Sequence, residues 1–97
     1  MNTPAVSVTD NPAAHRYDAD IDGTQAGFAA YRLDGDQVVF THTEIDSQFE
    51  GKGVGSALAR EALDDVRRRG RRVVPQCPFI AQWIDKHPDY QDLVDAG

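Results

Sequence analysis

The hydrophobic pattern of this chain changes abruptly at a glycine-rich segment near its middle, between residues 50 and 56. Before that segment, apolar and polar residues alternate in short runs that are separated by Asp22-Gly23 and Asp34-Gly35. Alternation predicts half-buried strands, and an Asp-Gly pair predicts a tight turn because glycine adopts positive φ without steric cost. We therefore predict an antiparallel meander of three strands, at residues 16–21, 25–33 and 37–45.

After the segment, apolar residues recur at helical spacing, which predicts one long helix that starts at about Val54. Gly70 marks its expected end, because a glycine with positive φ commonly caps a helix C-terminus. The apolar residues that define this helix are Ala57, Leu58, Ala62, Leu63 and Val66.

A fourth strand is predicted at residues 72–74, and it should lose pairing at Pro75, which has no N–H to donate. Pro78 is a favourable first residue for a short buried helix over residues 79–84, and His87-Pro88 should end that helix. The predicted fold class is therefore α+β, with a mainly antiparallel sheet, a long helix after the glycine-rich segment and a short C-terminal helix.

Length and composition limit what such a chain can be. A chain of 97 residues has room for one core, which we place in a single domain at residues 15–97, after a flexible N-terminal arm at residues 1–14. The sequence lacks a run long enough to span a membrane and a start typical of a signal peptide, and its one cysteine cannot form an internal disulfide. We therefore expect a cytoplasmic protein. Its formal charge of −6 argues against nucleic acid as the main partner.

The glycine-rich segment itself reads Glu50-Gly51-Lys52-Gly53-Val54-Gly55-Ser56 and joins a predicted strand to the predicted long helix. Its glycines allow the backbone to approach a ligand, and a helix start presents unpaired N–H groups and partial positive charge. Together these features favour a phosphate-binding loop, with a turn that binds no ligand as the alternative. The spacing does not fit a P-loop, and the antiparallel surroundings disfavour a dinucleotide fingerprint.

This segment resembles the pyrophosphate loop of GNAT N-acetyltransferases, which is Arg/Gln-x-x-Gly-x-Gly/Ala followed at once by a helix. Both Gln48–Gly53 and Glu50–Gly55 fit the pattern, and the second fits the helix start better, although Glu50 then replaces the usual Arg or Gln. Residues 73–79, Val-Val-Pro-Gln-Cys-Pro-Phe, are similar to a stretch of a short GNAT subgroup. The resemblance covers about residues 15–94. It implies an acyl-CoA N-acyltransferase fold.

The resemblance also implies ligands and contacts. Acetyl-CoA or CoA is the implied cofactor, and the implied acceptor is an amine of a small molecule, a protein lysine or a protein N-terminus. In this family the loop backbone binds pyrophosphate, and the preceding strand, here Thr43, Glu44 and Ile45, lends backbone groups to pantetheine. That strand separates from the next one, which is consistent with Pro75. The family's usual tyrosine acid is absent from the predicted helix around Trp83.

Three side chains are candidates for catalysis. His42 and Glu44 share one face of their predicted strand, and either is a candidate base for the acceptor amine. The alternative for both is an exposed strand face. Cys77 falls near the opening between the strands, where it is a candidate nucleophile or hydrogen-bond donor to the leaving thiolate. The alternative is a buried structural cysteine.

Three classes of function remain open from the sequence. The favoured one is N-acetyl transfer from acetyl-CoA to an amine, by direct attack in a ternary complex. The second is a CoA-binding module with little or no catalysis. The third is an interaction protein that uses the basic run Arg67–Arg72, although that run is also favourable charge placement at a helix C-terminus. The acidic composition would attract cationic amines.

Overall fold

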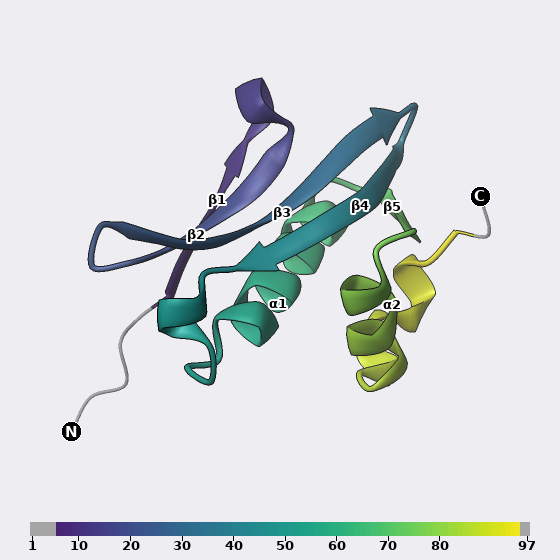
Figure 1. Ribbon diagram of the computed structural model, residues 1–97. Helices are drawn as coiled ribbons and strands as arrows, with labels where there is room; N and C mark the ends of the chain where they lie inside the picture. Colours follow the sequence, from purple (N-terminus) through teal and green to yellow (C-terminus); the bar gives the residue numbers. More distant parts are fainter. Residues whose placement is uncertain (1–5, 96–97) are drawn as a thin grey trace.

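Five strands pair in chain order to form one sheet in the computed structural model, which describes residues 6–95 (Figure 1). The first four strands are antiparallel, and the last strand pairs in parallel with the fourth. This arrangement confirms the predicted α+β class with a mainly antiparallel sheet. The strands are β1 (Val6–Asn11), β2 (Arg16–Ile21), β3 (Thr24–Asp34), β4 (Gln37–Ile45) and β5 (Arg72–Pro75).

Two α-helices and three short 3-10 helices complete the fold of the described residues. The glycine-rich segment leads from β4 into α1, and β5 leads into α2 (Figure 1). The helices are η1 (Pro12–Ala14), η2 (Ser47–Phe49), α1 (Val54–Arg68), α2 (Pro78–Asp85) and η3 (Pro88–Leu93).

Strand β1 corrects the expectation of a flexible arm over residues 1–14. Residues 6–11 pair with β2 along their whole length, from Val6 opposite Ile21 to Asn11 opposite Arg16. Val6 and Val8 pack against the core, because they alternate with polar residues as a half-buried strand requires. The antiparallel meander therefore has four strands instead of three. Residues 1–5 lie outside the described part of the chain.

Both ends of α1 follow the sequence signals. The helix begins at Val54, as predicted, and Gly70 with φ of 68° ends it. The Gly70 N–H donates to the Arg67 carbonyl at 3.0 Å, and the Arg71 N–H donates to the Val66 carbonyl at 3.0 Å. This pair of bonds is a Schellman motif, which satisfies carbonyls that the helix end leaves free.

One hydrophobic core unites the sheet with both α-helices. Tyr17, Phe40, Leu63 and Ile80 come from different elements and are all buried within it. In β2 the alternate residues Arg16, Asp18 and Asp20 are polar and occupy the opposite face of the sheet, which an antiparallel sheet can leave in water. The helices α1 and α2 therefore cover the same face.

Among residues 6–95, every helix is too short or too polar to cross a membrane.

A bulge in β4 decides which residues face the core near the end of that strand. Tyr31 pairs with Phe40 but Ala30 pairs with His42, so Thr41 is an extra residue in the ladder. The core side of β4 therefore passes from Phe40 to Thr43 and Ile45 instead of to His42 and Glu44.

Candidate functional site

The loop before α1 has a backbone that only glycine adopts easily. Gly51 has φ of 80° and Gly53 has φ of 79°, in the left-handed region. A Cβ added at either position would meet nothing within 4 Å. These two glycines are therefore required by backbone conformation and not by lack of space.

The start of α1, which is the positive end of the helix dipole, lacks a capping side chain within residues 6–95. Gly53 is the N-cap and has no side chain, and among the described residues no side chain caps this helix. The first turn contains no acidic residue. The first helical bond runs from the Ala57 N–H to the Gly53 carbonyl at 3.0 Å, which leaves the N–H groups of residues 54–56 outside the helical ladder. This arrangement suits an anion such as a phosphate.

Gly55 has a different reason to be glycine. A Cβ at this position would lie 2.7 Å from Cζ of Phe79, so the ring of Phe79 lies directly against the backbone of α1. Sequence reasoning attributed all three glycines of the loop to the ligand. The structure assigns Gly55 to the packing of α2 against the first turn of α1.

Ser56 contacts α2 through its side chain. The indole Nε1–H of Trp83 donates a hydrogen bond to Ser56 Oγ at 3.1 Å. Trp83 is buried, and the ring of His87 stacks on it with centroids 3.7 Å apart. The sequence placed Trp83 only in a buried helix. The signal for its further role is that Phe79 and Trp83 are one helical turn apart and so face the same neighbour.

Strands β4 and β5 separate just after Pro75, so β5 extends one residue beyond the predicted strand at residues 72–74. Their ladder runs from Gln37 opposite Arg72 to Phe40 opposite Pro75 and then stops. The Cys77 N–H donates to the Phe40 carbonyl at 2.9 Å, and the chain then turns into α2. Among the described residues, Thr41–Ile45 pairs only with β3. We call this segment the free half of β4. Its outer edge offers backbone hydrogen-bonding groups.

The catalytic candidates form two groups on opposite faces of β4. Thr43 faces the core side, where its Oγ1 lies 3.3 Å from the sulfur of Cys77. His42 and Glu44 share the other face, as predicted, with His42 Nε2 and Glu44 Oε2 2.9 Å apart. Both of these side chains are well exposed, at 59% and 63%. Cys77 in contrast is only 3% exposed and belongs to the hydrophobic core.

A hollow lies at the start of β3 and the end of β4, next to the exposed side chains of His42 and Glu44. It includes Glu44 and Ile45 but neither Cys77 nor the glycine loop. Gly27 permits the close approach of the two strands here, because a Cβ on it would lie 2.6 Å from the Glu44 carbonyl oxygen. In the part of the chain that the structure describes, no group of three acidic, His or Cys side chains could hold a metal ion. The hollow is lined by Gln25, Ala26, Gly27, Phe28, Glu44, Ile45 and Asp46.

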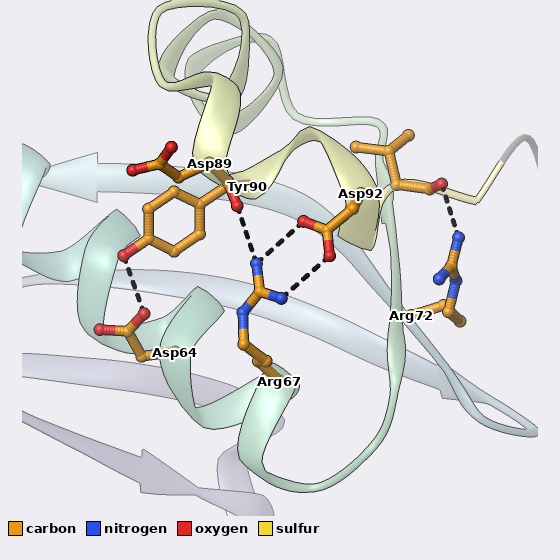
Figure 2. A network of polar contacts seen from close by, with 7 residues as sticks. Asp64, Arg67, Arg72, Asp89, Tyr90 and Asp92 are labelled. Carbon is orange, nitrogen blue, oxygen red and sulfur yellow. Dashed lines mark hydrogen bonds and ion pairs between the residues drawn. The ribbon is translucent and has the colours of Figure 1, made fainter.

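The basic run at the end of α1 is engaged in contacts within the chain (Figure 2). Arg67 makes two hydrogen bonds of 2.9 Å to the carboxylate of Asp92 and a third to the Asp89 carbonyl. Arg72 donates to the Val94 carbonyl at 3.1 Å. These bonds fasten the C-terminal segment to α1 and β5, which supports the structural interpretation of the run over an interaction surface.

All three tyrosines of the chain are also committed to aspartates. The hydroxyl of Tyr17 donates to Asp65 at 2.7 Å, and burial together with this bond raises the pKa of Tyr17. Burial raises the pKa of Tyr31 and of Tyr90 in the same way. Each of the three tyrosine hydroxyls therefore already has a carboxylate partner within the chain. The other two pairs are Tyr31 with Asp10 and Tyr90 with Asp64.

Solved structures share this fold. A GCN5-like protein from Staphylococcus aureus, provisionally assigned as an N-acetyltransferase and solved by NMR, superposes with a TM-score of 0.69 at 20% identity, over 98% of this chain and 91% of that one. The ribosomal-protein-S18-alanine N-acetyltransferase from Escherichia coli superposes with a TM-score of 0.60 at 17% identity, over 73% of this chain and 64% of its own length. These similarities concern the fold.

No curated protein matches the chain significantly. A family model described as GCN5-related N-acetyl-transferase matches residues 16–93, from β2 to the end of η3. The resemblance seen in the glycine loop and in residues 73–79 is thereby confirmed at the level of the family. The chain belongs to the GCN5-related N-acetyltransferase family.

Proposed function

We propose that this protein is an N-acetyltransferase that binds acetyl-CoA and transfers its acetyl group to an amine. One observation carries the proposal. The uncapped positive end of α1 follows the free half of β4 in the chain, with η2 and the glycine loop between them, so one connection joins an anion site to a row of backbone hydrogen-bonding groups. A ligand with a pyrophosphate at one end and an amide chain at the other matches both features.

Different residues would bind different parts of the cofactor. The N–H groups of Gly53, Val54, Gly55 and Ser56 would hold the pyrophosphate oxygens, and Lys52 would add positive charge. Glu50 is exposed, and its negative charge would repel a phosphate. Its carboxylate must therefore point away from the bound pyrophosphate. The backbone of Thr43–Ile45 would bind pantetheine.

The two groups on opposite faces of β4 suit the two halves of the reaction. Acetyl-CoA supplies an acetyl group activated as a thioester. On the exposed face, Glu44 or His42 would accept the proton of the attacking amine, directly or through a water. On the core side, the thiol of Cys77, next to the hydroxyl of Thr43, would donate a hydrogen bond to the leaving sulfur. A new C–N bond forms, the C–S bond breaks, and the proton moves from the amine to CoA thiolate.

A CoA-binding module with little catalysis is the second candidate. Cys77 is almost fully buried and all three tyrosine hydroxyls are bonded to aspartates, so the chain has few groups that can act as an acid. In either case we place the protein in the cytoplasm, where its lone cysteine stays reduced.

Binding and turnover are measured separately on one preparation. Native mass spectrometry of the freshly purified protein tests for retained CoA, and a thermal melt tests for stabilisation of roughly 2.7 kcal/mol at a CoA concentration about one hundred times Kd. Release of free CoA thiol is then followed with a polyamine, a lysine peptide and a peptide with a free N-terminus. Binding without release favours the module, and absence of binding eliminates both candidates.

A further inference from the structure

The hydrogen bond between Trp83 and Ser56 fixes the role of the serine hydroxyl. An indole N–H can only donate, so Ser56 Oγ is the acceptor in this 3.1 Å contact. The hydroxyl hydrogen of Ser56 therefore remains available to donate. Among residues 6–95, no hydrogen bond uses this hydroxyl as the donor, and Ser56 is exposed. A serine inside a helix often donates to the carbonyl four residues back, but here that residue is Lys52, which precedes the helix.

The direction of the indole N–H is set by the packing of its ring. Trp83 is 6% exposed, and the imidazole of His87 stacks on it at an interplanar angle of 12°. The ring of Tyr90 meets it edge-on with centroids 5.0 Å apart, and the guanidinium of Arg60 lies 5.5 Å from its centroid. A ring packed in this way has little room to rotate, so its packing keeps the N–H directed at Ser56.

Helix α2 holds the first turn of α1 at a second point as well. The ring of Phe79 lies against Gly55, one residue before Ser56. Phe79 and Trp83 are four residues apart on α2, so a single face of that helix contacts two successive residues of α1. The position of the α1 start is therefore set by α2 and not by a capping side chain.

We propose that Trp83 is a positioning residue for the cofactor: it holds the Ser56 hydroxyl so that its hydrogen is directed at a pyrophosphate oxygen of CoA. Ser56 is the third residue of α1, so its hydroxyl and its unpaired backbone N–H lie at the same helix end. The inference rests on the proposed function, because the acceptor is the phosphate that we place there.

A double-mutant cycle tests the inference by calorimetric titration with CoA and with dephospho-CoA, which keeps the pyrophosphate but lacks the 3′-phosphate. Ser56→Ala removes the donor, and Trp83→Phe keeps an aromatic ring but removes the indole N–H. A hydrogen bond to a charged group is worth enough that Ser56→Ala should weaken both ligands about tenfold or more. Trp83→Phe should weaken both ligands severalfold. The double variant should bind like Ser56→Ala alone, because Trp83 acts only through the serine.

Tyr90→Phe is the matched control. It removes a hydroxyl that bonds to Asp64 while keeping the ring that packs on Trp83, and it should leave CoA affinity unchanged. Additive losses in the cycle would show that Trp83 acts by packing alone and would overturn the inference. Full affinity in either single variant would overturn it as well. A wild-type protein that binds no CoA removes the proposed function and this inference together.

Fluorescence gives a second readout that does not depend on the folding of Trp83→Phe. Trp83 is the only tryptophan of the chain, so its emission reports on its own hydrogen bond. CoA should change the emission of the wild-type protein, and Ser56→Ala should shift the emission of the unliganded protein and diminish the response to CoA. An emission spectrum and a CoA response that are unchanged in Ser56→Ala would contradict the proposal.

Discussion

The hydroxyl oxygen of Thr43 lies 3.3 Å from the sulfur of Cys77, although 34 positions separate the two residues in the chain. Two local events bring them together. The bulge at Thr41 turns Thr43 to the core side of β4, and the end of the ladder at Pro75 directs the chain back across Phe40. The contact therefore exists only because β4 and β5 separate at this point.

Cys77→Ala should lower kcat more than it changes CoA affinity. In the proposed reaction the thiol acts on the leaving sulfur, and general acid catalysis contributes about a hundredfold or more. Turnover is measured per folded molecule, with CoA affinity by calorimetry. Mass spectrometry after incubation with acetyl-CoA alone should show no acetyl adduct if Cys77 only donates a hydrogen bond, and an adduct removable by hydroxylamine if it accepts the acetyl group. A rate that survives with lower stability in Cys77→Ser would make Cys77 a packing residue.

Glu44→Gln should reduce kcat/KM for the amine while the Kd of CoA stays the same. The carboxylate is exposed on the face of β4 opposite to Cys77, and the hollow that it lines does not include the glycine loop. The pH profile of the rate provides the check, because loss of a base changes its acid side. Asp20→Asn is the control, since it removes a carboxylate from the same face of the sheet in β2. Equal losses in the two variants would point to general electrostatic attraction of the amine.

Gly53→Val should abolish CoA binding in a protein that still folds. Valine at φ of 79° is strained by about 1–2 kcal/mol, and its side chain would occupy the path of the pyrophosphate. Gly35→Val is the control, because Gly35 also has positive φ, 62°, with nothing near its added Cβ, and lies in the β3–β4 turn. Both variants should lose comparable stability in a urea melt, but only the first should lose CoA. Retained affinity in Gly53→Val would move the phosphate elsewhere.

Substitutions in the basic run should separate stability from binding. The helix from Gly55 to Arg68 rises about 20 Å, so Arg68→Ala should leave CoA affinity unchanged. Arg67→Ala should lower the melting temperature, because it removes the bonds to Asp92 and to the Asp89 carbonyl (Figure 2). Thermal melts with and without CoA measure both effects. A tenfold loss of CoA affinity in Arg68→Ala would contradict the course of α1 in the site.

Asp65 should make the fold sensitive to acid. The pKa of Asp65 is lowered in the folded chain. Burial by itself raises this pKa, but the hydrogen bond from Tyr17 and the charges of Arg69 and Arg68 together lower it by a larger amount. Because the pKa is lower in the folded chain, the unfolded chain binds more protons below the ordinary value of 3.8. The stabilisation is therefore complete above that pH and is lost as the pH falls through the lowered pKa. Asp65→Asn should be less stable at pH 7, and its deficit in urea melts should shrink towards pH 3.

Local signals predicted the parts of the fold that depend on neighbouring residues. The start of α1 at Val54, its end at Gly70 and the role of Pro78 as the first residue of α2 each follow from one or two positions. Strand β1 was missed because its alternation covers only six residues, and its pairing with β2 is what stabilises it.

The geometry of the site depends on contacts that sequence patterns do not encode. Nothing in the run Phe40–Thr43 predicts a bulge, because Thr41, His42 and Thr43 are all polar and show no alternation that an extra residue could interrupt; only the pairing with β3 reveals it. The bond from Trp83 to Ser56 and the contact of Phe79 with Gly55 depend on how α2 packs against α1. Sequence reasoning could name the residues of the loop and of β4, but it could not say which of them touch.

The free half of β4 makes the sheet incomplete on its own. Unpaired strand edges attract other strands, so an empty protein exposes a site where a second chain can pair. A pantetheine arm seated there would take the place of the missing strand, and cofactor would act as a solubilising component as well as a reactant. The concentration of cofactor around the protein would then set how often this edge is open to self-association.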